Sequence, residues 1–112
     1  AADHIEKHIS LDQALNIRAA HVYLVTIEGD SMQDAGIFSG DLAVVDRAIE
    51  AGHGHVVVAL LNNDPLCKRL CLRGKKVILG SENPRYPDRY VMEGDDLSIW
   101  GVITYTVRSH EH

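Results

Sequence analysis

The chain has 112 residues with 11 basic and 16 acidic side chains, which gives a formal net charge of −5. Hydrophobic residues make up 46% of the sequence and charged residues 24%, so wholesale disorder is excluded and one domain is expected. The net negative charge disfavours direct, specific binding to DNA, because phosphates repel such a surface. The strongest apolar run, residues 55–61, is too short to cross a bilayer, so we expect a cytoplasmic protein that does not bind a membrane.

The predicted elements begin with one helix. Ser10, followed by Gln13 three residues later, forms a capping-box pattern that predicts a short helix over residues 10–17. β-Branched, apolar and aromatic residues then predict strands at 21–27, 42–46, 55–61, 66–72, 76–79 and 97–107. Turn residues at 62–64 and Gly74 separate three of these strands, and Gly101 predicts a bend or bulge in the last one.

This pattern predicts a mainly β protein: a compact, coiled all-β fold of short strands. It has one short N-terminal helix and a short helical turn near Ser31. The expected organisation is an N-terminal arm at residues 1–20, a β domain at 21–108 and a tail at 109–112.

A candidate nucleophile lies in the segment 28–37, Glu-Gly-Asp-Ser-Met-Gln-Asp-Ala-Gly-Ile. Gly29 permits a sharp turn after a strand, and Ser31 lies where a short helix would begin. Backbone N–H groups at such a position, here those of Asp30 and Ser31, can receive a developing oxyanion. The alternative is that Ser31 only caps the helix.

The candidate general base is Lys68. Because side chains alternate along a strand, Lys68 shares its face of strand 66–72 with the leucines of that strand, while Arg69 and both cysteines face the other way. Burial on a leucine face would lower the pKa of the amine from about 10.4 toward about 7, so that it could accept the proton of Ser31. The alternative is a lysine whose stem covers apolar surface while its amine stays in water. None of the seven histidines lies in a recognisable catalytic motif.

The remaining candidate ligands predict no metal and no cofactor. Cys67 and Cys71 are four residues apart, about 13 Å in a strand, so we expect two reduced thiols and no disulfide. His53 and His55 are separated by a glycine and have no suitably spaced further ligand.

Several motifs together resemble the LexA/UmuD family of self-cleaving Ser-Lys peptidases. The segments 29–32, 34–37, 40–42 and 44–46 are similar to that family's nucleophile signature. Residues 67–70, Cys-Lys-Arg-Leu, resemble its lysine strand, usually Val-Lys-Arg-Leu or Val-Lys-Lys-Leu, and Lys68 follows Ser31 by 37 residues. Segments 79–84 and 100–103 resemble the loop and closing strand that follow. The resemblance implies that Ser31 is the nucleophile and Lys68 the general base.

Within the family, residues 1–15 are similar to the segment of UmuD just after its self-cleavage site. The scissile Ala-Gly or Cys-Gly bond would lie upstream of Ala1, and the absence of an initiating Met leads us to expect a processed form. The resemblance then implies self-cleavage promoted by a RecA filament, followed by formation of a homodimer. This homodimer would serve a UmuC-like Y-family translesion DNA polymerase as an accessory subunit in SOS mutagenesis. Two alternatives remain: the C-terminal self-cleavage and dimerisation domain of a LexA-type repressor, and a binding module with a vestigial dyad.

Overall fold

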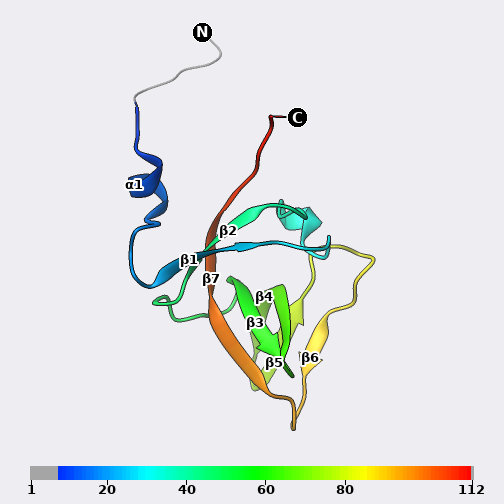
Figure 1. Cartoon of the computed structure of the whole chain (residues 1–112). Coiled ribbons are helices and arrows are strands. Elements are labelled where there is room, and N and C mark those ends of the chain that lie inside the picture. Colours follow the sequence, from blue (N-terminus) through cyan, green and yellow to red (C-terminus); the bar gives the residue numbers. More distant parts are fainter. Residues whose placement is uncertain (1–7, 112) are drawn as a thin grey trace.

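The computed structural model describes residues 8–111, in which seven strands form one antiparallel sheet (Figure 1). The order of the strands across the sheet is β1-β2-β7-β3-β4-β5-β6. Their bounds are β1 Val22–Thr26, β2 Leu42–Asp46, β3 Val56–Leu61, β4 Asp64–Arg73, β5 Lys76–Gly80, β6 Arg89–Val91 and β7 Leu97–Val107. Two short helical segments complete the chain, α1 at Leu11–Leu15 and the 3-10 turn η1 at Gln33–Ala35. The predicted mainly β fold is confirmed.

Two tight turns set the register of the central strands. Asn62 and Asn63 connect β3 to β4 with φ values of 51° and 69°, the left-handed pair that a two-residue type I′ turn requires. Gly74, with φ of 59°, begins the next two-residue turn, so that Arg73 pairs with Lys76. Both turns lie where the sequence predicts them. Strand β6 was not predicted, because a strand of three residues is too short to show an alternating pattern.

Helix α1 is shorter than predicted and differs at its start. Ser10 occupies the N-cap position, but its side chain makes no capping hydrogen bond, so the predicted capping box with Gln13 is wrong. No residue of α1 is buried, so no tertiary packing holds the helix end in the capped geometry. Asn16 ends the helix in the left-handed conformation with φ of 56°. Neither helical segment within residues 8–111 has the length and apolar character needed to span a membrane.

Strand β7 joins the two halves of the sheet. Val102 pairs with Asp46 of β2 and also with Val57 of β3. The register shifts once on each partner, so β7 contains a bulge on either side of Val102. Gly101 lies at one of them, and a Cβ atom there would be 2.7 Å from Val45 Cγ1. The predicted bend or bulge at Gly101 is confirmed, and glycine fits there because β2 approaches too closely for a Cβ atom.

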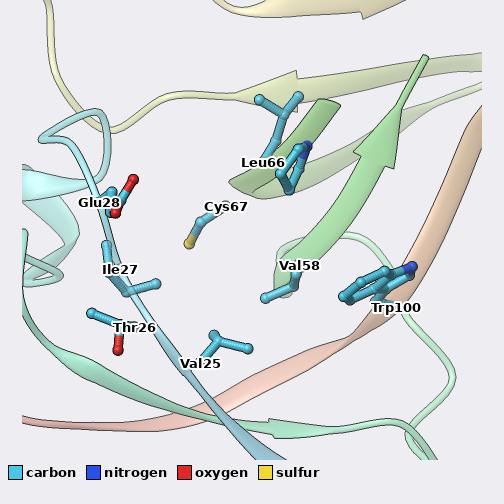
Figure 2. Close-up of a pocket in the computed structure, with 9 residues that line it drawn as sticks. Val25, Thr26, Ile27, Glu28, Val58, Leu66, Cys67 and Trp100 are labelled. Atoms are coloured by element: carbon cyan, nitrogen blue, oxygen red, sulfur yellow. The ribbon is translucent and has the colours of Figure 1, made fainter. Parts of the chain in front are cut away.

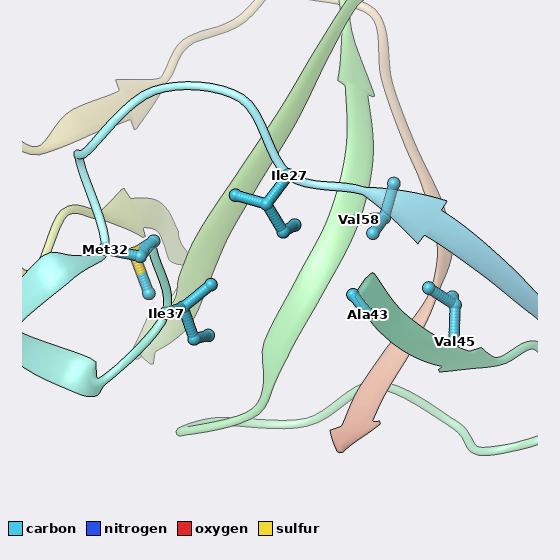
Figure 3. Close-up of a cluster of buried hydrophobic side chains, with 6 residues drawn as sticks. All are labelled: Ile27, Met32, Ile37, Ala43, Val45 and Val58. Carbon is cyan, nitrogen blue, oxygen red and sulfur yellow. The ribbon is translucent and has the colours of Figure 1, made fainter. Parts of the chain in front are cut away.

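The buried side chains form two clusters, with β4 between them. The first cluster contains Ile27, Met32, Ile37, Ala43, Val45 and Val58 (Figure 3). The second contains Val57, Ala59, Leu61, Leu70, Leu79 and Val102. Cys67 packs against the first cluster while Leu66 and Leu70 pack in the second, so both faces of β4 are covered. The leucine face of Lys68 is therefore a core face, except at Leu72, which is 41% exposed near the end of the strand.

Candidate active site

Ser31 lies in the turn between β1 and η1. Gly29, with φ of 87°, reverses the chain, and Met32, which is only 2% exposed, anchors the turn in the first cluster. Met32 rather than Ser31 occupies the N-cap of η1, so Ser31 does not have the alternative role of a helix cap. The Ser31 side chain is half-buried and precedes η1 by two residues.

The carbonyl groups of Asp30 and Ser31 both accept hydrogen bonds from this chain. The carbonyl oxygen of Ser31 accepts a hydrogen bond from the N–H of Glu82 at 2.8 Å, and that of Asp30 accepts one from Gln33 at 3.2 Å. Among residues 8–111, no hydrogen bond uses the N–H of Asp30 or Ser31 as donor. Both groups can therefore donate to an oxygen that is not part of this chain.

Lys68 lies on β4 with its side chain half-buried. Its Nζ donates a hydrogen bond to Ser81 Oγ at 3.0 Å and lies 5.8 Å from the centre of the Tyr86 ring. Burial lowers the pKa of the Lys68 amine, while Cys67 and Asp88 act in the opposite direction. The direction of the shift is the one that a general base needs, because it increases the neutral fraction of the amine.

One loop, residues 81–88, connects the serine turn to the lysine; we call it the bridging loop. Besides the Glu82–Ser31 hydrogen bond, the side chain of Asn83 donates to the carbonyl oxygen of Asp30 at 2.8 Å, and the Tyr86 hydroxyl donates to the Asp30 carboxylate. The adjacent residue, Ser81, accepts the hydrogen bond of the Lys68 amine. Neighbouring residues of one loop therefore hold the two candidate catalytic segments.

Sequence motifs indicate the serine turn and the lysine strand, but no motif gives a role to Ser81, Asn83 or Tyr86. A signal for Ser81 was present: because Arg69 pairs with Gly80 in the β4–β5 hairpin, the same register places Ser81 across from Lys68. The contacts of Asn83 and Tyr86 with Asp30 join residues more than 50 positions apart, and no local pattern reveals them.

A groove of about 230 Å³ lies along the end of β1, and neither Ser31 nor Lys68 lines it (Figure 2). Its lining residues come from β1 and the residues after it, from β3, from the start of β4 and from β7: Val25, Thr26, Ile27, Glu28, Val58, Pro65, Leu66, Cys67 and Trp100. The groove is mostly apolar, and Glu28, which lines it, precedes Ser31 by three residues. β1 is one of the two edge strands of the sheet, so an extended peptide can bind beside it through backbone hydrogen bonds.

The cysteines and histidines have other environments. Both cysteines are free and half-buried, and burial raises the pKa of the Cys67 thiol to about 11. His53 accepts a hydrogen bond from the N–H of Leu72, and His55 accepts one from the N–H of Gly52, each through Nδ1 at 2.9 Å. Within the part of the chain that the structure describes, no three His, Cys, Asp or Glu side chains are grouped to hold a metal ion.

The fold is a coiled antiparallel sheet. Its candidate site combines a serine turn with a half-buried lysine, and one loop joins the two, as in a serine-lysine peptidase-like domain. Residues 1–104 match the family described as Peptidase S24-like, and the chain belongs to this family. The resemblance to LexA/UmuD-type proteins is thereby confirmed at the level of the family.

The curated relatives include proteins named LexA repressor, three of which are described. The one from Bordetella avium is 37% identical over 110 residues, covering 98% of this chain and 51% of the relative. That from Cupriavidus taiwanensis is 39% identical over 109 residues, covering 97% and 50%, and that from Shewanella piezotolerans is 37% identical over 110 residues, covering 97% and 53%. The chain thus spans about half the length of the curated relatives it matches.

Proposed function

We propose that the chain is an autoproteolytic serine endopeptidase domain in which Ser31 is the nucleophile and Lys68 the general base. The observation that supports this assignment is the bridging loop, which binds the backbone of Ser31 through Glu82 and the amine of Lys68 through the adjacent Ser81. Burial lowers the pKa of Lys68, which is the direction that a general base needs.

In the proposed reaction, neutral Lys68 takes the proton of the Ser31 hydroxyl as its oxygen attacks the scissile carbonyl carbon. The backbone N–H groups of Asp30 and Ser31 stabilise the oxyanion. The Lys68 ammonium then protonates the leaving amine, the peptide bond breaks, and an acyl ester remains on Ser31. Water hydrolyses this ester with Lys68 again as base, which restores both side chains.

The proposed substrate is an Ala-Gly or Cys-Gly bond in a segment upstream of residue 1, bound in extended form along the edge of β1. The groove between β1 and β4 can accept apolar side chains of such a segment. Residues 1–7, which belong to the expected arm, lie outside the described range.

We further propose that the chain corresponds to the self-cleaving, dimer-forming part of a LexA-type repressor in the SOS response to DNA damage. The names of the relatives and the coverage of about half of each favour this over a UmuD-like polymerase subunit. The expectation of a UmuC-like polymerase partner has no support beyond membership of the family. The proposed partners are a RecA filament, which promotes cleavage, and a second copy of the chain, which forms the dimer.

The test uses the chain extended by its own upstream coding sequence. Self-cleavage is followed by mass spectrometry between pH 6 and 10, with and without RecA filaments on single-stranded DNA. We expect cleavage whose rate rises with pH, and a loss of about 1,000-fold or more in Ser31→Ala and in Lys68→Ala. Ser98→Ala, which removes an exposed hydroxyl from β7, is the matched control and should cleave at the unsubstituted rate.

Cleavage that persists in both dyad variants would refute the assignment. If the unsubstituted extended chain never cleaves, with or without RecA, the binding-module alternative is correct. If the upstream coding sequence encodes no DNA-binding domain, a UmuD-like function is favoured over a LexA-type repressor.

A further inference from the structure

The hydroxyl of Ser81 is held at the Lys68 amine by the sheet itself. Ser81 follows β5 directly, and the pairing of Arg69 with Gly80 brings it across from Lys68, where Nζ and Oγ are 3.0 Å apart. The N–H of Ser81 donates to the Asp88 carboxylate at 3.1 Å, which gives the residue a second attachment. Both Ser81 and Lys68 are half-buried, so water competes less for this hydrogen bond than at an exposed position.

A lysine that acts as a base needs more than a lowered pKa. Its neutral amine has two N–H bonds and one lone pair, and only the lone pair can accept the proton of Ser31. The lysine side chain has many rotamers, so an unattached amine would point its lone pair in many directions. The Tyr86 ring at 5.8 Å attracts a cation but does not select one orientation of the amine. A hydrogen-bond acceptor at one N–H of the amine, by contrast, restricts the orientation of the amine.

We propose that Ser81 is a positioning residue for the general base: its hydroxyl accepts a hydrogen bond from Lys68 Nζ and thereby directs the amine's lone pair toward the Ser31 hydroxyl. This inference rests on the proposed Ser31–Lys68 chemistry and adds a residue to it. Ser81 does not itself exchange protons with substrate. The geometry also connects the two sides of the site, because the next residue, Glu82, donates its N–H to the Ser31 carbonyl.

The charges around the amine determine what removal of the Ser81 hydroxyl should do. The ionisable side chains on the elements packed around Lys68 include Asp30, Asp34, Cys67, Arg69, Glu82, Arg85, Tyr86 and Asp88. Glu82 is paired with Arg69, and Asp30 accepts the Tyr86 hydroxyl. The Ser81 hydroxyl stabilises the ammonium form more than the neutral amine, because a hydrogen bond from a charged donor is the stronger one. Its loss should therefore lower the pKa of Lys68 while it releases the amine.

The first experiment needs no cleavage activity. The present chain is labelled with ¹³C-lysine, the Lys68 signal is assigned from its loss in Lys68→Arg, and its titration is followed by NMR. We expect the midpoint to move to lower pH in Ser81→Ala and in Ser81→Cys, which keeps the volume but is a weak acceptor. Ser81→Thr, which retains a hydroxyl, should titrate as the unsubstituted chain does, and so should the control Ser98→Ala.

The second experiment measures self-cleavage of the upstream-extended chain across pH. In Ser81→Ala the maximal rate at high pH should fall about tenfold or more, because the amine is no longer oriented, and the midpoint of the pH profile should fall with the pKa. Ser81→Thr should restore both. A loss of folded protein alone would lower the rate at every pH without moving the midpoint.

An unchanged maximal rate in Ser81→Ala would overturn the proposal, and so would equal loss of rate in Ser81→Thr. If the unsubstituted extended chain does not cleave, the proposed function fails by itself. The NMR titration then decides the Ser81 contact alone, and an unmoved midpoint in Ser81→Ala overturns that as well.

Discussion

Two neighbouring residues of β4, Cys67 and Lys68, show how burial acts on different ionisable groups. Both side chains leave water, and in each case the neutral form is favoured: the pKa of the thiol rises to about 11, and the pKa of the amine falls. Because alternation places them on opposite faces of the strand, the thiol packs in the first cluster while the amine reaches Ser81. The neutral thiol is a poor nucleophile at neutral pH.

The raised pKa of Cys67 predicts a loss of stability in alkali. A thiol whose pKa is about 11 when folded and about 9.0 when unfolded stabilises the fold fully below pH 9, and this contribution is lost as the pH rises toward 11. Its size is at most on the order of 2 to 3 kcal/mol. We expect urea denaturation to show a larger fall in unfolding free energy between pH 8 and 10.5 for the unsubstituted chain than for Cys67→Val. Cys71→Val, which removes the other half-buried thiol, should retain the full alkaline fall. Parallel falls in the unsubstituted chain and Cys67→Val would contradict the prediction.

At the scale of elements, β7 determines the shape of the sheet. Its 11 residues pair with β2 through one half and with β3 through the other, and the two bulges allow the strand to turn between these partners. β2 follows the serine turn in the chain and β3 pairs with the lysine strand β4. The bend in β7 therefore connects the strand that follows the serine turn with the strand pair that carries Lys68.

Gly101 tests this bend. A Cβ atom there would lie 2.7 Å from Val45 Cγ1 and 2.9 Å from the carbonyl oxygen of Asp46, and a backbone atom cannot move aside as a side chain can. We expect Gly101→Ala to lower the unfolding free energy by about 2 to 4 kcal/mol, measured by urea denaturation. Gly52→Ala is the matched control, because the nearest atom to its new Cβ would be 4.0 Å away, and it should change stability little. Equal stability of the two variants would show that β2 and β7 can separate at low cost.

At the scale of the whole molecule, the end of β7 is connected to the segment that follows the serine turn. The Arg108 guanidinium binds both carboxylate oxygens of Asp41, at 2.8 and 3.0 Å, donates to the carbonyl oxygen of Gly36 and stacks on the Phe38 ring. Asp41 is 1% exposed, and it also accepts the N–H of Phe38. The hydrogen bond from Arg108 holds the pKa of the Asp41 carboxyl below its usual value. The ion pair between Arg108 and Asp41, 67 positions apart, thus stabilises the segment that follows the serine turn.

Breaking this pair should destabilise the fold in a pH-dependent way. Arg108→Ala leaves a buried carboxylate without its cation, which we expect to cost about 1 to 3 kcal/mol at pH 7. Because the pKa of Asp41 is depressed in the folded state, its contribution is present above the unfolded pKa of about 3.8 and is lost as the pH falls through the folded pKa. The difference between unsubstituted chain and variant should therefore shrink at pH 3. Arg108→Lys, which keeps the charge but not the paired donors, should lie between them, and a difference that is equal at pH 7 and pH 3 would contradict the ion-pair explanation.

Local patterns predicted much of this molecule. The turn residues at 62–64 predict the β3–β4 hairpin, Gly74 predicts the break between β4 and β5, and short motifs indicate Ser31 and Lys68 as candidate residues. The capping box predicted at Ser10 is wrong. The sequence pattern is local, and no buried residue of α1 holds the helix end in the capped geometry. Strand β6 was not predicted from the sequence, because its three residues form a strand by pairing with β5.

The order of apolar, polar and turn residues alone determined which segments are strands, where the hairpins reverse and that Lys68 shares its face of the strand with leucines. These properties depend on backbone conformation and on alternation over a few residues. Only the tertiary structure decided that Ser81 receives the Lys68 amine, that Asn83 and Tyr86 hold Asp30, and that Arg108 neutralises Asp41. Such contacts join distant residues, and their geometry exists only after the coiled sheet has brought its strands together.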